Sequence, residues 1–82
     1  MSIYAEVREE RERAHAKHGD TSMESCAPDD YRRLAILAEE IGEVAREFNE
    51  GHHRGTGPDL VRLRKELIQV AAMAVAWADV IA

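Results

Sequence analysis

The sequence has a single cysteine, Cys26, among its 82 residues, so no disulfide can form within one chain. Aromatic residues are also scarce, with one tryptophan, two tyrosines and one phenylalanine, although apolar residues make up 45% of the chain. The apolar residues are mainly Leu, Ile, Val and Ala, which suit closely packed helices. No stretch of useful length alternates between polar and apolar residues, so the sequence predicts an all-α fold.

Signals for secretion or membrane insertion are missing as well. The N-terminus leads directly into charged residues, which predicts a cytoplasmic protein without a signal peptide. The longest apolar segment, residues 67–82, is interrupted by Gln69 and Asp79 and is shorter than the ~20 residues that span a bilayer. A net charge of −5 argues against general binding to nucleic acid. We therefore expect neither a membrane nor a nucleic-acid partner.

Three helices are predicted. They cover about residues 2–17, 30–49 and 58 to near the C-terminus of a single domain, residues 1–82. Ser2 is a residue type that caps helix N-termini. Pro28 followed by Asp29 and Asp30 signals the second start, and Pro58 followed by Asp59 signals the third. Gly51 is predicted to end the second helix.

Apolar residues recur on one face of the second helix at spacings of three and four: Leu34, Leu37, Ile41, Val44 and Phe48. The third helix is apolar on nearly every side from residue 67 onward, and such a helix must be surrounded. Two companion helices from so short a chain can scarcely surround it. The sequence therefore predicts a small helical bundle of about three helices that is completed by homo-oligomerisation.

Glutamates crowd one part of the second helix and are opposed only by Arg46: Glu39, Glu40, Glu43, Glu47 and Glu50. At about 100° per residue, all but Glu39 fall within an arc of about 80°. Like charges three and four residues apart repel each other. The segment is therefore either a solvated face or a site for a divalent cation, with Glu47 and Glu50 assigned to the solvated edge.

Carboxylate oxygens on rigid helices suit Mg²⁺ or Mn²⁺. We expect a second contribution from the third helix, where Glu66 and Gln69 lie one turn apart at the change from basic to apolar sequence. An acid and an amide at the edge of a buried stretch are costly unless they are satisfied. A metal ion between this pair and Glu40 and Glu43 would satisfy both.

Two segments together resemble a known signature. E-E-I-G-E, residues 39–43, and K-E-L-I-Q, residues 65–69, resemble the E-E-x-x-E…E-x-x-D pattern of MazG-like nucleotide pyrophosphohydrolases. The segment E-R-x-R-x-x-x-K-H-G, residues 10–19, also resembles small MazG-like proteins. The resemblance spans about residues 7–77. It implies an all-α dimer or tetramer that uses Mg²⁺ to hydrolyse nucleoside triphosphates to the monophosphate and diphosphate.

By this resemblance, Glu40, Glu43 and Glu66 are metal ligands, and Glu39 holds a second metal or orients the attacking water. Catalysis is assigned to Glu39 and Glu43. The last acid of the family pattern is Asp, whereas this chain has Gln69, which offers a carbonyl oxygen but no charge. Metal binding is therefore expected to be weaker. The alternatives are an inactive module for nucleotide binding or protein interaction, and a purely structural bundle without a ligand.

Basic residues are the candidates for binding the substrate. Arg62 and Lys65, with Arg54, follow the acidic helix in the sequence and are assigned to the leaving diphosphate. Lys17 and His18, at the end of the first helix, are assigned to the base pocket.

Overall fold

A computed structural model describes residues 2–18 and 30–81, which form three helices: α1 (Ile3–His18), α2 (Tyr31–Arg54) and α3 (Leu60–Asp79). No strand occurs in these two ranges, so the all-α prediction is confirmed. The loop predicted over residues 19–29, with Cys26, lies outside the described residues.

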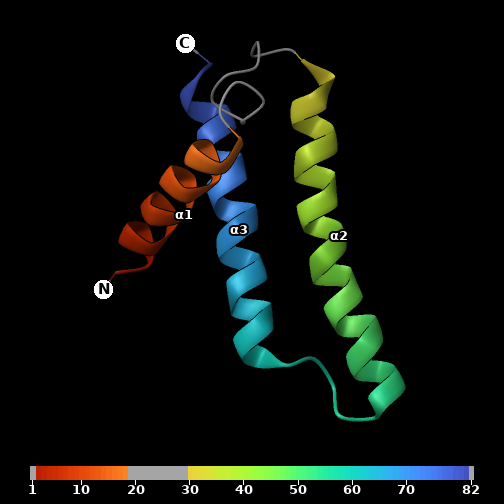
Figure 1. Cartoon of the computed structure of the whole chain (residues 1–82). Coiled ribbons are helices and arrows are strands. Elements are labelled where there is room, and N and C mark those ends of the chain that lie inside the picture. The colour runs from red at the N-terminus through yellow and green to blue at the C-terminus, as the bar shows by residue number, and fades with distance from the viewer. Residues whose placement is uncertain (1, 19–29, 82) are drawn as a thin grey trace.

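Helix α3 lies between the other two helices (Figure 1). Helices α2 and α3 run antiparallel, and α1 runs beside α3 and diverges from it toward the N-terminus. Two ion pairs join α1 to α3. Arg64 contacts both carboxylate oxygens of Glu6 at 2.8 and 2.6 Å, and Arg11 contacts Asp79 at 3.1 Å. These pairs place the start of α1 near the start of α3 and the middle of α1 near the end of α3.

Each helix begins where a polar side chain can cap it. Side-chain oxygens of Ser2, Asp30 and Asp59 accept hydrogen bonds from backbone N–H groups two or three residues later, at 2.9 to 3.3 Å. Such bonds satisfy donors that the first turn of a helix leaves without partners. The predicted starts are confirmed to within two residues, with Asp59 as the cap and Leu60 as the first residue of α3.

The predicted end of α2 at Gly51 is wrong, because the helix continues to Arg54. Gly55 ends it instead, with φ of 76°, and its N–H bonds to the carbonyl oxygens of Gly51 and His52. Gly51 itself is buried inside the helix. A Cβ atom added there would lie 2.2 Å from the carbonyl oxygen of Gly57, so Gly51 permits the returning chain to pass close to α2.

The core of the described residues is small and made mostly of alanine: Ala14, Ala72, Met73 and Ala76 are buried, with Val7, Ile36, Leu37 and Trp77 packed against them. Small side chains on α3 allow α1 and α2 to pack closely against it from two sides. Met73 is part of this core, and Trp77 packs against it. A core of this size buries little apolar area for a domain that is already near the lower limit of independent folding.

Many large apolar side chains remain at the surface of the single chain. They are Ile3, Tyr4, Tyr31, Leu34, Ile41, Phe48, Leu60, Val61, Leu67, Val75 and Ile81. In the predicted seam of α2, Leu37 and Val44 are half-buried, whereas Leu34, Ile41 and Phe48 are 59%, 52% and 50% exposed. No described helix is both long enough and apolar enough to cross a membrane.

Candidate functional site

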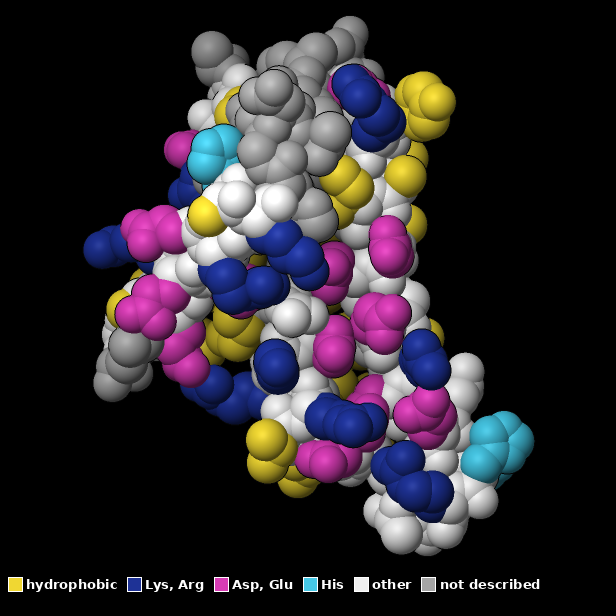
Figure 2. Space-filling view, in the orientation of Figure 1, with side chains coloured by type: hydrophobic (Ala, Val, Ile, Leu, Met, Phe, Trp, Pro, Cys, Tyr) yellow, Lys and Arg dark blue, Asp and Glu magenta, His cyan; other side chains and the backbone are white. Residues whose placement is uncertain are grey.

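The antiparallel packing of α2 and α3 brings three of the predicted site residues together. With its amide nitrogen turned toward the carboxylates, Gln69 donates hydrogen bonds to Glu66 Oε2 at 2.9 Å and to Glu40 Oε2 at 3.3 Å. Glu66 and Gln69 lie one turn apart on α3, and Glu40 faces them from α2. Figure 2 shows acidic side chains gathered along the boundary between these two helices.

Glu40 lies in a strongly negative environment. Its pKa is raised above the ordinary value, first because burial disfavours the charged form and then because of the charges of Glu66, Glu39, Glu43 and Glu10. Glu40 and Glu43 are half-buried, whereas Glu39 is exposed. The charges of the other acids predicted for the site, Glu39, Glu43 and Glu66, thus all raise the pKa of Glu40, although Glu39 is more exposed than the other two.

The donor chemistry of this cluster fits a hard divalent cation, which prefers carboxylate and amide oxygens. The geometry is not that of a formed metal site, since residues 2–18 and 30–81 contain no group of three or more His, Cys, Asp or Glu side chains placed to hold an ion. The amide nitrogen of Gln69 instead lies between two carboxylates. Rotation of that amide by half a turn would present its carbonyl oxygen to a cation.

Helix α1 contributes two residues that the sequence did not identify as part of the site. Glu10 accepts a hydrogen bond from Arg13 Nε at 2.9 Å and a second from its terminal nitrogen. The pKa of Arg13 is raised, mainly by this pairing with Glu10 and also by the charge of Glu40. Both residues lie in the E-R-x-R segment, but charge alone did not indicate that this segment would reach the acidic cluster.

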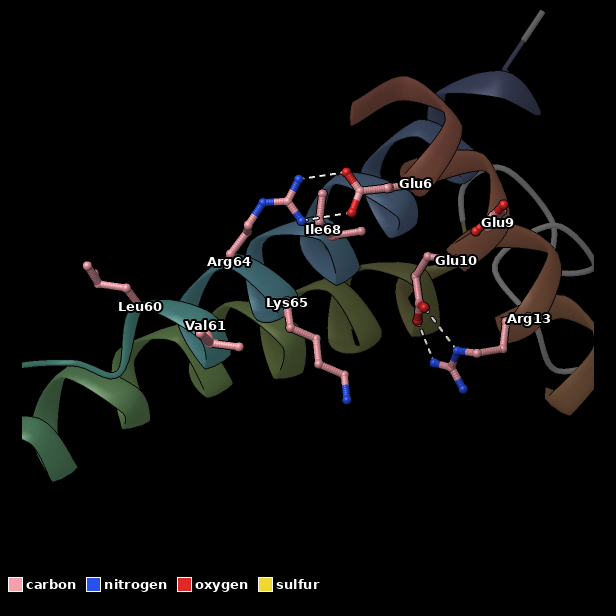
Figure 3. A pocket seen from close by; sticks show the side chains of 9 residues that line it. All are labelled: Glu6, Glu9, Glu10, Arg13, Leu60, Val61, Arg64, Lys65 and Ile68. Atoms are coloured by element: carbon pink, nitrogen blue, oxygen red, sulfur yellow. Dashed lines mark hydrogen bonds and ion pairs between the residues drawn. The ribbon is translucent and has the colours of Figure 1, made fainter. Parts of the chain in front are cut away.

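The predicted substrate-binding residues of α3 lie in two different hollows. Lys65 lines a cleft of about 570 Å³ between α1 and α3, together with Glu10 and Arg13 (Figure 3). Arg62 lines a hollow of about 450 Å³ at the connection between α2 and α3, together with Arg54. The basic segment 62–65 is therefore divided between two surfaces.

Of the two residues proposed for the base pocket, the structure describes the side chain of Lys17 alone. Lys17 is exposed in the last turn of α1, and the side chain of His18 lies outside the described residues.

The assignment of Glu47 to the solvated edge is wrong. Glu47 is only 5% exposed, and its Oε1 atom accepts a hydrogen bond from the backbone N–H of Asp59 at 2.8 Å. Arg54 lies 3.6 Å from the same oxygen. Glu47 therefore ties the end of α2 to the start of α3. Glu50 is half-buried and pairs with Arg46 at 3.0 Å, away from this contact.

Comparisons with known protein families, with curated proteins and with solved structures find no match to this chain. Its function is therefore inferred from the chemistry of its own residues.

Proposed function

We propose that this chain is a metal-dependent nucleoside triphosphate pyrophosphohydrolase of the MazG-like kind. It would convert a free cytoplasmic (d)NTP and water into the (d)NMP and diphosphate. The observation that carries the proposal is the convergence of Glu40 on α2 with Glu66 and Gln69 on α3. This convergence joins the two sequence segments that resemble the MazG-like signature.

The electrostatics of the cluster support a cation as its ligand. Burial and then four neighbouring carboxylates raise the pKa of Glu40, and a divalent cation would offset the repulsion between these carboxylates. Glu40, Glu43 and Glu66 would hold Mg²⁺ or Mn²⁺, with the carbonyl oxygen of Gln69 completing the set. When bound, the ion would neutralise phosphate charge and lower the pKa of a water molecule. Exposed Glu39 would orient that water by accepting a hydrogen bond from it.

The surface of the single chain supports assembly with a second copy. Leu34, Ile41 and Phe48 recur every seven residues on α2. Around the helix they lie roughly 80° to 120° from Glu40 and farther than that from Glu43. Their exposure leaves an apolar row that a partner chain would cover. A homodimer or homotetramer would thus leave the acidic face open.

Release of diphosphate tests the proposed reaction. The purified protein is incubated with each common NTP and dNTP in Mg²⁺ or Mn²⁺, and diphosphate is converted to phosphate by an added inorganic pyrophosphatase. We expect metal-dependent release from at least one nucleotide. A well-folded protein that turns over none of them would exclude the reaction.

Three variants assign the reaction to the acidic cluster. Glu43→Gln and Glu66→Gln each remove one charge without changing side-chain volume, and we expect each to lower the rate at least a hundredfold. Glu50→Gln is the matched control, because Glu50 lies on the same helix but pairs with Arg46. Rates that fall equally in all three variants would indicate a general effect of charge or stability.

The hydrogen bonds of Gln69 favour a second candidate, a binding module without catalysis. Its amide satisfies Glu40 and Glu66 without an ion. Gln69→Glu restores an acid at nearly the same volume and discriminates between the candidates. If the natural protein is inactive and the variant gains both Mg²⁺ binding and turnover, the natural chain is the binding module. Turnover by the natural protein excludes this candidate.

A further inference from the structure

Three cationic side chains line the cleft between α1 and α3, and they differ in their partners: Arg13, Arg64 and Lys65. Arg64 uses two guanidinium nitrogens on the two carboxylate oxygens of Glu6, so it is committed to holding the helices together. In the part of the chain that the structure describes, the ammonium group of Lys65 makes no hydrogen bond or ion pair. Figure 3 shows that Lys65 and Arg13 extend to the same side of the cleft.

Among the described residues, Arg13 pairs only with a neighbour on its own helix. Its side chain is 55% exposed, and its partner Glu10 lies three residues earlier on α1. Exposed pairs of this kind stabilise a helix only weakly. A multiply charged anion can therefore displace Glu10 at little cost, whereas it would have to break an interhelical contact to recruit Arg64.

The position of Arg13 also connects the cleft to the acidic cluster. Its partner Glu10 lines the cleft and is one of the charges that act on Glu40. The charge of Glu40 in turn raises the pKa of Arg13. Lys65 directly precedes Glu66 on α3 and lies about 40° around the helix from Gln69, which bridges Glu40 and Glu66. An anion held by Arg13 and Lys65 would lie next to a cation held by the cluster.

We infer that Arg13, together with Lys65, binds the diphosphate end of the substrate, and that Arg13 exchanges Glu10 for phosphate oxygens when the substrate enters. This inference rests on the proposed function and adds a residue from α1 to it. The planar guanidinium group can donate two parallel hydrogen bonds to a phosphate, which an ammonium group cannot do. The released Glu10 carboxylate would remain beside the cluster.

This role predicts opposite effects on two binding constants. The positive charge of Arg13 repels a divalent cation from the acidic cluster when no anion is present. The same charge attracts an anion once the cation is bound. An arginine that only stabilised α1 would change neither constant.

Calorimetry on the full chain measures both constants, with Mg²⁺ alone and with inorganic diphosphate in saturating Mg²⁺ as the probes. For Arg13→Gln we expect Mg²⁺ to bind about two- to fivefold more tightly, because one repelling charge is removed at a largely solvated site. Diphosphate should bind about tenfold or more weakly, which corresponds to one charge-assisted contact. Arg13→Lys should retain the natural Mg²⁺ affinity and recover only part of the diphosphate affinity.

Arg8→Gln is the control, since it removes the same charge from the same helix but at an exposed residue that lines a different hollow. We expect both constants to stay at their natural values in this variant. Equal diphosphate affinity in the natural protein and in Arg13→Gln overturns the inference, and so does a natural protein that does not bind diphosphate in Mg²⁺.

The outcomes also separate the inference from the proposed function. Nucleotide turnover whose KM is unchanged in Arg13→Gln would overturn the inference and leave the function standing. Binding of diphosphate that depends on Arg13, in a protein that hydrolyses no nucleotide, would sustain the inference and exclude the function.

Discussion

The half-buried carboxylate of Glu40 lies among other carboxylates, and its position is unfavourable for stability in the absence of an ion. Burial and four neighbouring charges raise its pKa above the ordinary value of 4.5. The folded state therefore binds a proton at Glu40 more tightly than the unfolded state does. By linkage, Glu40 destabilises the fold most above its folded pKa, and this effect disappears as the pH falls to 4.5.

Glu40→Gln should accordingly stabilise the protein without metal at neutral pH. Glutamine keeps an acceptor for the Gln69 amide and removes the charge, so we expect the Tm to rise by a few degrees. The advantage should shrink as the pH is lowered through the raised pKa of Glu40 toward 4.5. Thermal melts of both proteins in a chelator, at a series of pH values, measure this difference.

Comparing the two proteins at each pH cancels the contribution to stability of other titrating groups. One such group is Glu6, whose pKa is lowered by its hydrogen bonds with Arg64. A difference in Tm that is the same at every pH would contradict the assignment to Glu40. Adding Mg²⁺ should stabilise the natural protein more than the variant, because only the natural protein offers the Glu40 carboxylate.

At this scale, helical periodicity assigned each side chain to a face of its own helix. The prediction that Glu40 would face Glu66 and Gln69 also needed the cost of leaving an acid and an amide unsatisfied at the edge of a buried stretch. Periodicity could not predict the burial of Glu47. That burial depends on where the chain turns back between α2 and α3, which brings the N–H of Asp59 within 2.8 Å of the carboxylate. The turn is a tertiary feature that no local pattern encodes.

The two glycines within α2, Gly42 and Gly51, differ in the space around them. At Gly51 a Cβ atom would lie 2.2 Å from the backbone of Gly57, whereas at Gly42 it would meet nothing within 4 Å. Gly51→Ala should therefore destabilise the protein by about 1–3 kcal/mol through overpacking. Gly42→Ala should stabilise it by about 0.5–1 kcal/mol, because alanine loses less entropy in a helix.

Chemical denaturation of the two variants checks these opposite signs. Both changes are the same substitution in the same helix, so intrinsic helix propensity cannot explain a difference between them. Stabilisation by both would show that the connection after α2 moves away from Gly51 easily.

Helix starts were predicted to within two residues because the signals for them are local. Ser2 and Asp30 act through hydrogen bonds to residues two or three positions later, which the sequence specifies directly. The end of α2 was predicted at Gly51 because glycine commonly ends helices. This glycine serves a contact with a distant segment instead, and Gly55 has the left-handed backbone that ends the helix.

The whole molecule depends on how three helices are arranged, and this arrangement was the least predictable feature. The placement of α1 beside α3 combines the packing of Ala14 into the core with the pairs Glu6–Arg64 and Arg11–Asp79, which lie 58 and 68 residues apart in the sequence. This placement brings Glu10 and Arg13 to the acidic cluster. Because surface ion pairs have many possible partners in a charged chain, the sequence did not identify these two residues.

The apolar surface of the bundle leads to a prediction about its assembly. Leu60, Leu67 and Ala74 on α3, and Ile81 just after its end, recur every seven residues and are exposed. Leu67 lies about 160° from Gln69 around the helix. This row and the exposed row of α2 therefore lie on the side of the α2–α3 pair away from the Gln69 bridge. Apolar rows of this period are suited to packing against helices of a second chain.

Ile41→Glu places a charge in the middle of the α2 row, where Ile41 is 52% exposed in the single chain. We expect sedimentation velocity to show a dimer or tetramer for the natural protein and a monomer for the variant. Ala35→Glu is the control, since it adds the same charge to an exposed position about 120° from Ile41 on α2. The natural protein should also melt at a temperature that rises with concentration, because dissociation accompanies unfolding. A natural protein that sediments as a monomer and melts independently of concentration would show that three helices suffice, despite the small core that they enclose.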